Sequence, residues 1–336
     1  MKIADLEHFR DLLLERERAL YEWERCCTLG FHGESEKVQE LLGEIKNALQ
    51  RVDNHTFGVC QVCAGEVELH RLEVQPVRQV CLDCIDQDER TTLEEELFLA
   101  SKIHRALLPQ QVEHIPGFEV GAKSLAAHLV GGDYYDFLPA VDGNAVRVII
   151  ADSMGKGLPA SLVMSNLQGA LRILAQGNNS PAHLLDRLNH WLCRNIPVTK
   201  FISLACLALE APGDRQTRLL YANAGHPPPF LLHANGEVEQ MDATGTVIGV
   251  HEDFHYEENR LTLTAGDTIV LYTDGVTEAQ NEQGELFGEQ RLLEFVRDHH
   301  REQLSTIIHG LIREIDRFTT LPEPADDLTV IALRKV

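Results

Sequence analysis

The spacing of hydrophobic residues predicts a helical beginning for this chain. Within residues 5–52, apolar side chains recur at helical spacing in two separate runs, which indicates two helices. Gly30 and Gly33 lie between the runs, so we expect a short break that folds the helices into an antiparallel hairpin. Residues 57–86 form only short segments around cysteines, and residues 91–108 return to helical spacing.

From Gly117 onward, apolar runs of strand length mix with amphipathic runs of helix length. The predicted strands are bounded by turn residues and cover 145–152, 201–209, 217–224, 260–264, 268–274 and 328–336. The predicted helices cover 158–176, 181–196, 288–298 and 301–318. Because the strands come in hairpin clusters with helix pairs between them, the pattern favours an α+β fold, a β-sandwich flanked by helix pairs, over a doubly wound parallel sheet.

Length and charge exclude several classes of protein. With 336 residues, the chain is long enough for more than one core. Its 52 acidic and 30 basic residues give a formal charge of −22, which argues against nucleic acid and anionic membranes as partners. No apolar run approaches the ~18 residues of a membrane span, and the first residues lack the features of a signal peptide, so we expect a cytoplasmic protein.

Four of the eight cysteines form two Cys-x-x-Cys pairs. Cys60 and Cys63 make the first pair, Cys81 and Cys84 make the second, and seventeen residues separate the pairs. This spacing is typical of a tetrahedral site with four thiolate ligands, so one structural Zn²⁺ is predicted; a redox dithiol is the less favoured alternative. No metal role is predicted for the other four, Cys26, Cys27, Cys193 and Cys206.

The region around these cysteines resembles the DksA/TraR family of zinc-finger regulators of RNA polymerase. The similarity covers about the first ninety residues and rests on a G-x-C-x-x-C…RLE…P…C-x-x-C pattern. In that family, a long helical hairpin with acidic residues at its tip enters a channel of the polymerase. Here the tip segment is TLGFHGESEK, without the family's paired aspartates, so the resemblance favours a scaffold that serves as a sensor or docking arm.

Four aspartates in the second part of the chain stand beside glycine or a second acid. They are Asp133 in VGGDYYDF, Asp152 in IIADSMGKG, Asp274 in LYTDGVTEA and Asp326 in ADDLTVI. The last three lie at the ends of apolar runs, where carboxylates from several strands can meet at one edge of a sandwich. An oxygen-rich site without nearby cysteine or a histidine cluster is suited to Mg²⁺ or Mn²⁺.

The same motifs resemble SpoIIE/RsbU-type phosphatases, which are part of the PPM family of metal-dependent Ser/Thr phosphatases. The similarity runs from about Leu93 to the end of the chain, with the motifs in family order. It implies two Mn²⁺ or Mg²⁺ ions at one edge of the sandwich, where a metal-activated water hydrolyses the phosphoester. The implied catalytic ligands are Asp152 for both ions, Asp274 and Asp326 for the first, and Asp133 with the backbone carbonyl of Ser153 for the second.

Other polar residues in these motifs have competing interpretations. His226, in NAGHPPP, is either a general acid or, as we favour, a structural turn residue. Lys156 either meets the substrate phosphate or is a solvated surface lysine. Asp136 and Asp327 are either supporting or solvated residues. No Cys-x5-Arg loop is present in the sequence, which argues against a phosphocysteine route.

The expected function is therefore that of a protein phosphatase acting on phosphoserine or phosphothreonine. The resemblance implies as typical substrate a STAS-domain anti-sigma-factor antagonist in a partner-switching pathway. In such relatives the helix before the catalytic domain mediates dimerisation, and a homodimer is predicted because one helix face here carries Leu93, Leu97, Ala100, Ile103 and Leu107. The alternatives are a transcription regulator that binds RNA polymerase through the finger, and a catalytically inactive scaffold, which is disfavoured because all four aspartates are present.

These features divide the chain into four predicted segments. Residues 1–56 form the helical hairpin, and residues 57–90 form the four-cysteine zinc finger. Residues 91–109 form a linker and dimerisation helix, and residues 110–336 form the phosphatase domain.

Overall fold

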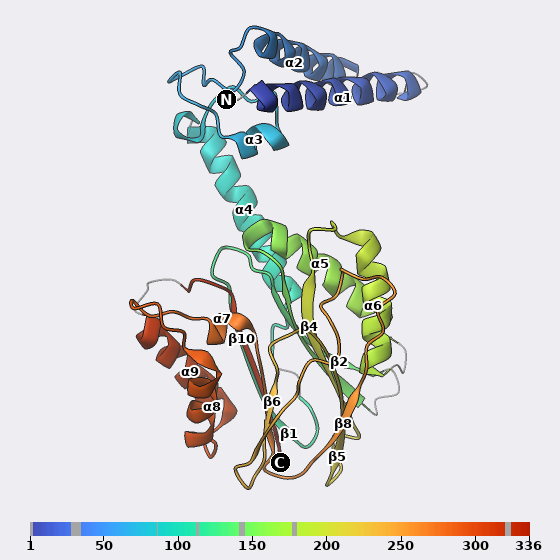
Figure 1. Cartoon of the computed structure of the whole chain (residues 1–336), viewed down its shortest axis with the longest axis vertical. Helices are drawn as coiled ribbons and strands as arrows, with labels where there is room; N and C mark the ends of the chain where they lie inside the picture. Colours follow the sequence, from blue (N-terminus) through green and yellow to red (C-terminus); the bar gives the residue numbers. More distant parts are fainter. Residues whose placement is uncertain are drawn as a thin grey trace. The chain divides into compact units, whose positions relative to one another are not determined.

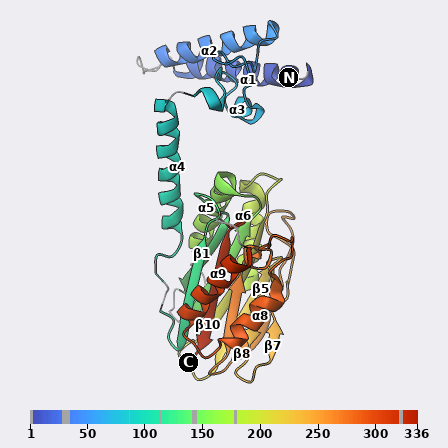
Figure 2. The ribbon, with the colours of Figure 1, turned by 90° about the vertical axis from the view of Figure 1, so that its left-hand side faces the viewer.

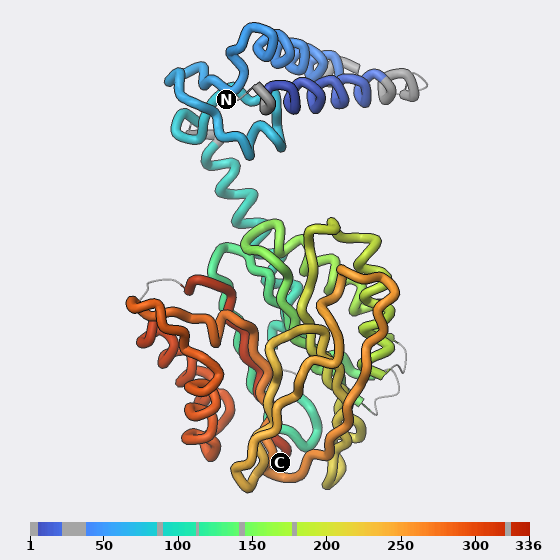
Figure 3. The backbone as a smooth tube through the Cα atoms, in the orientation of Figure 1, coloured from blue at the N-terminus to red at the C-terminus, as the bar shows by residue number. Residues whose placement is uncertain are grey.

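The computed structural model divides into two compact units, Met1–Glu95 and Glu96–Val336 (Figure 1). Each unit has a hydrophobic core of its own. The backbone can be followed by colour along the chain in Figure 3. The structure describes residues 3–27, 35–85, 87–111, 114–140, 145–176, 180–319 and 324–336.

The first unit begins with a helical hairpin. Helices α1 (Ile3–Cys27) and α2 (Ser35–Asp53) lie side by side in both ribbon views, as the two apolar runs predict (Figures 1 and 2). The predicted turn, with Gly30 and Gly33, lies outside the described residues. The structure therefore confirms the two predicted helices of the hairpin.

A small core joins this hairpin to the cysteine-rich region. Phe9 and Leu13 of α1 are buried against Ile45 of α2 and against side chains that follow the hairpin. That following region contains only the short helix α3 (Leu69–Val74) and a single turn of 3₁₀ helix, η1 (Leu82–Cys84). A metal ion is one element that stabilises small units of this kind.

Helix α4 (Gln87–Leu107) begins earlier than predicted. The sequence pattern placed its start at Thr91, but Gln87 to Arg90 already have helical backbone. None of these residues is a helix breaker, so nothing local stops the helix from extending backwards. None of the helices in the described ranges is long and apolar enough to cross a membrane.

The second unit is a sandwich of two five-stranded antiparallel sheets. The first sheet has the strand order β1-β10-β9-β6-β7, and the second has the order β2-β3-β4-β5-β8. The inner faces of the sheets enclose a core that includes Ile150, Leu207, Leu271 and Ile331. The strands are β1 (Phe118–Leu125), β2 (Asp133–Pro139), β3 (Ala145–Ser153), β4 (Ile202–Glu210), β5 (Thr217–Ala224), β6 (Phe230–Leu232), β7 (Val238–Gln240), β8 (Asn259–Leu263), β9 (Thr268–Tyr272) and β10 (Leu328–Lys335).

Helix pairs cover the outer faces of the two sheets. Helices α5 (Gly157–Leu174) and α6 (Pro181–Asn195) pack on the second sheet. Helices α8 (Gly288–Asp298) and α9 (Leu304–Thr319) pack on the first sheet, which they cover in the view of Figure 2. The predicted β-sandwich flanked by helix pairs is confirmed.

Four strands have no counterpart among the predicted ones: β1, β2, β6 and β7. Strand β2 reads DYYDFLP and is buried at six of its seven residues, so it lacks the alternation of a half-buried strand. In β1, Phe118, Val120 and Ala122 do alternate and face the core between the sheets. This alternation is the feature of the sequence from which β1 could have been predicted.

Candidate metal centres

The four predicted zinc ligands lie together in the first unit. The Sγ atoms of Cys60, Cys63, Cys81 and Cys84 are all within 4.8 Å of one another, and those of Cys63 and Cys81 are 3.7 Å apart. The Cys81 backbone N–H donates to the Cys60 sulfur at 3.4 Å, and the Gly65 N–H donates to the Cys63 sulfur at 3.4 Å. The two Cys-x-x-Cys pairs therefore form one sulfur cluster.

Crowding makes the ionisation of these thiols interdependent. Hydrogen bonds from backbone amides, chiefly that of Cys81, lower the pKa of Cys60 to about 6. Contacts with the Cys63 and Cys81 sulfurs, followed by burial, raise the pKa of Cys84 to about 12. Ionisation of one thiol thus makes ionisation of its neighbours less favourable, because the negative thiolates repel one another. A divalent cation bound between the sulfurs would offset this repulsion. The donor set and its closeness fit Zn²⁺.

Cys193 and Cys206 take no part in this cluster. Cys206 is buried in β4, and burial raises the pKa of its thiol to about 12. Cys193 is only partly buried, and its thiol lies 3.6 Å from the Asn189 side-chain oxygen. The side chains of Cys26 and Cys27 lie outside the described residues.

Strand register brings the four predicted aspartates to one end of the sandwich. In the second sheet, Asp133 begins β2 and is paired with Asp152 of β3. In the first sheet, β9 and β10 are antiparallel neighbours. Asp274 follows the end of β9, at the start of the short helix α7 (Asp274–Thr277), and Asp326 precedes the start of β10. The end of one strand adjoins the start of the next, so both acids lie at the same edge.

Two buried threonines connect Asp133 to the opposite sheet. The hydroxyls of Thr273 and Thr329 donate to Asp133 Oδ2 at 2.8 and 2.6 Å. Thr273 precedes Asp274 and Thr329 belongs to β10, so the carboxylate of the second sheet is held by both strands of the first. Sequence reasoning missed both threonines, although each belongs to one of the aspartate motifs.

Burial and mutual repulsion raise the pKa values of these carboxyl groups. Burial is the main cause for Asp152, whose pKa rises to about 8, and the charges of Asp274 and Asp326 add to it. Burial also raises the pKa of Asp274, and burial followed by the charge of Asp152 raises that of Asp133 well above its usual range. Divalent cations would stabilise the ionised forms, so this oxygen-rich cluster fits Mn²⁺ or Mg²⁺.

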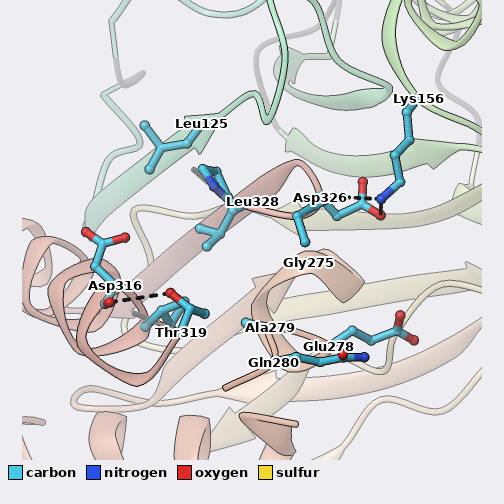
Figure 4. Close-up of a pocket in the computed structure, with 13 residues that line it drawn as sticks. Leu125, Lys156, Gly275, Glu278, Ala279, Gln280, Asp316, Thr319, Asp326 and Leu328 are labelled. Atoms are coloured by element: carbon cyan, nitrogen blue, oxygen red, sulfur yellow. Dashed lines mark hydrogen bonds and ion pairs between the residues drawn. The ribbon is translucent and has the colours of Figure 1, made fainter. Parts of the chain in front are cut away.

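Lys156 forms an ion pair with Asp326. Its ammonium group lies 2.9 Å from Asp326 Oδ2 and 2.6 Å from the Ala325 carbonyl oxygen, beside a pocket of about 290 Å³ (Figure 4). Lys156 is thus a surface lysine, its side chain 51% exposed, whose ammonium is paired with Asp326. Its contact with a substrate phosphate stays a prediction. Among the described residues, only the cysteines place three or more candidate ligand atoms within 4.8 Å of one another, so the aspartate oxygens are spaced more widely.

Asp136 and Asp327 support the fold, and both are buried. The Asp327 carboxylate accepts hydrogen bonds from the backbone N–H groups of Ala127 at 2.8 Å and Gly132 at 2.6 Å, which fixes the loop before β2. Asp136 lies 2.8 Å from the guanidinium of Arg172 on α5. The interpretation of either residue as a solvated acid is wrong.

Ser153 is held tightly against a glycine. Its hydroxyl donates to the Ala160 carbonyl oxygen at 3.0 Å, so it is engaged inside the fold. A Cβ atom at Gly132 would lie only 2.9 Å from the Ser153 carbonyl oxygen, which explains why this position needs glycine. The use of that carbonyl as a metal ligand stays a prediction.

His226 is a structural residue. Its side chain is buried, with Nδ1 2.9 Å from the Ser203 hydroxyl and Nε2 3.1 Å from the Tyr272 carbonyl oxygen. Burial lowers the pKa of His226 to about 3. Because both ring nitrogens have partners and the ring is neutral, the favoured interpretation as a structural residue agrees with the geometry, and the general-acid alternative does not.

Known proteins resemble the second unit in sequence. The family described as stage II sporulation protein E (SpoIIE) matches residues 142–336. The phosphoserine phosphatase RsbU of Bacillus subtilis (strain 168) is 30% identical over 249 residues, which cover 72% of this chain and 71% of RsbU. The phosphoserine phosphatase RsbP of the same organism is 30% identical over 193 residues, or 56% of this chain and 47% of RsbP.

Solved structures share the fold, and a further relative resembles the cysteine region. The SiaA-PP2C domain of Pseudomonas aeruginosa has a TM-score of 0.64 at 24% identity, covering 73% of this chain and 98% of that domain. The PP2C phosphatase domain of SpoIIE from Bacillus subtilis, with a fragment of its regulatory domain, has a TM-score of 0.55 at 20% identity, covering 65% and 62%. The RNA polymerase-binding transcription factor DksA of Escherichia coli (strain K12) is 33% identical over 49 residues, 15% of this chain and 32% of DksA.

Proposed function

Because this chain belongs to the SpoIIE family and is a protein phosphatase, we propose that it dephosphorylates phosphoserine or phosphothreonine on a STAS-domain anti-sigma-factor antagonist in a partner-switching pathway. The names of RsbU and RsbP as phosphoserine phosphatases support the class of substrate residue. The observation that carries the proposal is the position of Asp133, Asp152, Asp274 and Asp326 at one end of the sandwich.

These four carboxylates and the Ser153 carbonyl would hold two Mn²⁺ or Mg²⁺ ions. When bound, such ions lower the pKa of a water molecule and stabilise charge on the attacking and leaving oxygens. The raised pKa of Asp152, about 8, supports this assignment because it reflects an excess of buried negative charge. Asp152 would contact both ions, with Asp274 and Asp326 on the first and Asp133 on the second.

Three further residues position the proposed metal ligand Asp133. Thr273 and Thr329 fix the orientation of the Asp133 carboxylate through two hydrogen bonds. Asp327 anchors the loop that leads into β2 and thereby places Asp133 at the start of its strand.

The Cys206 thiol, buried and with its pKa raised to about 12, is unsuited to act as a nucleophile.

The sulfur cluster of the first unit would hold one structural Zn²⁺. Four thiolates close the coordination sphere of zinc and leave no position for a substrate, so this ion serves folding rather than hydrolysis. The small apolar core around Phe9, Leu13 and Leu72 supports this role, because it is modest for a folded unit.

A homodimer formed through α4 would regulate the phosphatase. Three of its apolar side chains are more than half exposed, at 58% each: Phe98, Leu99 and Ile103. Leu97 is 41% exposed. Exposed apolar residues grouped on one helix are suited to contact a second copy of the same helix.

RNA polymerase is the second candidate partner, because of the similarity to DksA over 49 residues. The acidic charge of −22 argues against nucleic acid and an anionic membrane as further partners. We place the protein in the cytoplasm, where partner switching and transcription take place and where unpaired cysteines are common.

The proposal is tested by incubating the full chain with a phosphorylated STAS-domain protein and Mn²⁺. Release of phosphate that stops in excess EDTA is the expected result. Binding to RNA polymerase is measured on the same preparation by sedimentation. Polymerase binding without any phosphatase activity would refute the first proposal in favour of the second.

A further inference from the structure

A groove with cationic walls borders strand β1 in the second unit. Two adjoining pockets of about 400 Å³ and 280 Å³ share Arg105, Leu108, Lys123 and Ser124 as lining residues. The larger pocket reaches Asp133 at the aspartate cluster. The groove is therefore continuous with the proposed catalytic edge.

Strand β1 presents its free edge to this groove. In the sheet order β1-β10-β9-β6-β7 it is the outermost strand, and within the described residues it pairs only with β10. Five consecutive residues, 122–126, line the two pockets. The side chains of a strand point alternately to its two faces, so consecutive residues line one groove only where the groove runs along the edge of the strand. The backbone groups of β1 face the groove at that edge. Such an edge can accept an added strand.

Two cationic side chains, those of Arg105 and Lys123, line both pockets of the groove. Arg105 comes from the last turn of α4, Lys123 from β1, and His128 from the loop before β2. Among the described residues, neither Arg105 nor Lys123 forms an ion pair or a side-chain hydrogen bond. In a chain with a charge of −22, unpaired cations on two different elements are suited to an acidic ligand.

The two carboxylates at the deep end of the groove do not neutralise these cations. Asp327 accepts hydrogen bonds from two backbone amides, and Asp133 accepts hydrogen bonds from Thr273 and Thr329. The Ser124 hydroxyl lies 2.9 Å from the Thr329 hydroxyl, whose own proton is donated to Asp133, so β1 lies two hydrogen bonds from Asp133. A peptide aligned along β1 would therefore end beside the aspartate cluster.

We propose that this groove binds an extended acidic segment of the phosphoprotein substrate, next to its phosphorylated residue, as an added strand along β1. The inference rests on the proposed function and specifies its substrate. Backbone hydrogen bonds to β1 would hold the segment, and Arg105 and Lys123 would select acidic side chains. The two pockets, of about 400 Å³ and 280 Å³, offer more room than a single phosphate ion needs and suit a peptide.

The test compares short phosphoserine peptides with p-nitrophenyl phosphate, all with Mn²⁺ and the full chain. Peptides carry glutamates or glutamines on either side of the phosphoserine. Arg105→Glu combined with Lys123→Glu is expected to raise KM roughly tenfold for a glutamate peptide, since each exposed charge pair contributes modestly. The kcat for that peptide and the hydrolysis of p-nitrophenyl phosphate should be unchanged. Arg215→Glu, at an exposed position outside the groove, is the charge control.

A second arm tests the added strand itself. Two versions of the glutamate peptide carry methyl groups on alternate backbone nitrogens, one version on the odd positions and the other on the even positions. One version should have a raised KM and the other an unchanged KM, because only alternate N–H groups of a strand face its neighbour. Equal KM values for glutamate and glutamine peptides, or an equal effect of the charge reversal on p-nitrophenyl phosphate, would overturn the proposal. Failure of the wild type to hydrolyse any of these compounds would instead refute the proposed function.

Discussion

At the scale of single residues, Asp152 is the centre of the proposed active site. It lies opposite Asp133 in the sheet, and its raised pKa reflects both burial and the neighbouring charges of Asp274 and Asp326. A carboxylate there can contact two cations at once. An amide of the same shape has no charge and only one good oxygen ligand.

Asp152→Asn is therefore expected to lower phosphatase activity at least about a hundredfold, because a contact to both ions is lost. Its fold, measured by circular dichroism, should be retained. The assay uses a phosphorylated protein with a titration of Mn²⁺. Cys193→Ser is the matched control and should leave turnover intact, because no thiol nucleophile is proposed. Full activity of Asp152→Asn, or of the wild type in excess EDTA, would refute the two-metal site.

His226 gives a prediction for pH dependence. Its folded pKa of about 3 lies below the ordinary value, so the unfolded chain binds a proton that the folded protein does not. The stability that depends on a neutral His226 is fully present above about pH 6.5 and is lost as the pH falls towards 3.

The loss between pH 7 and pH 5 is about 2 kcal/mol for this one residue. In urea unfolding, the stability of the wild type should fall by roughly that much more than the stability of His226→Gln over this range. Both proteins contain the same carboxylates, which titrate in the same interval. The difference between their unfolding free energies therefore isolates the contribution of His226. Parallel pH curves for the two proteins would mean that His226 is not held neutral by burial.

At the scale of elements, helix α4 carries the proposed regulation. Its apolar residues include several that no other part of the described chain covers, such as Phe98 and Ile103 at 58% exposure. The sequence pattern identified a face with Leu97 and Ile103 but did not indicate Phe98 or Leu99. Their exposure depends on which side of α4 packs on the sandwich, where Ser101 and His104 are buried.

Leu97→Glu should weaken dimerisation about tenfold or more and change phosphatase activity at the same time, because a charge would enter an apolar contact. Sedimentation velocity over a range of concentrations measures the association. Gln283→Glu adds one negative charge at an exposed position outside α4 and is the control. A wild type that stays monomeric at high concentration, with unchanged activity in Leu97→Glu, would remove α4 from regulation.

At the scale of the whole molecule, the two units have separate cores and different candidate metal ligands. The first unit depends on four cysteines and a small core, and the second has a complete sandwich between two layers of helices. Sulfur ligands in one unit and oxygen ligands in the other select different ions. Loss of one metal is therefore expected to leave the other unit folded.

Cys81→Ser tests this independence. It should abolish zinc binding and unfold the first unit, since binding of the metal supplies much of the folding free energy of such small modules. Elemental analysis should give one zinc per wild-type chain and none in the variant. Calorimetry should show the transition of the second unit nearly unchanged. Fresh wild-type protein without zinc, or loss of both transitions in Cys81→Ser, would contradict the assignment.

The sequence by itself identified the residues of both candidate centres and the main elements. Cysteine spacing is local, so Cys60, Cys63, Cys81 and Cys84 could be identified without knowledge of the fold. Helical periodicity and β-branched runs are also local, which is why the boundaries of β5 and α8 agree with their predicted ranges. The layered sandwich follows from the order of these elements along the chain.

Tertiary structure alone decided which polar groups meet. The pairing of Asp133 with Asp152, the hydrogen bonds from Thr273 and Thr329, and the neutral state of His226 depend on register and burial across distant strands. Partly buried acids such as Asp152 acquire raised pKa values only when the fold removes water and brings like charges together. The free edge of β1 is likewise a property of sheet order, which no local pattern in the sequence encodes.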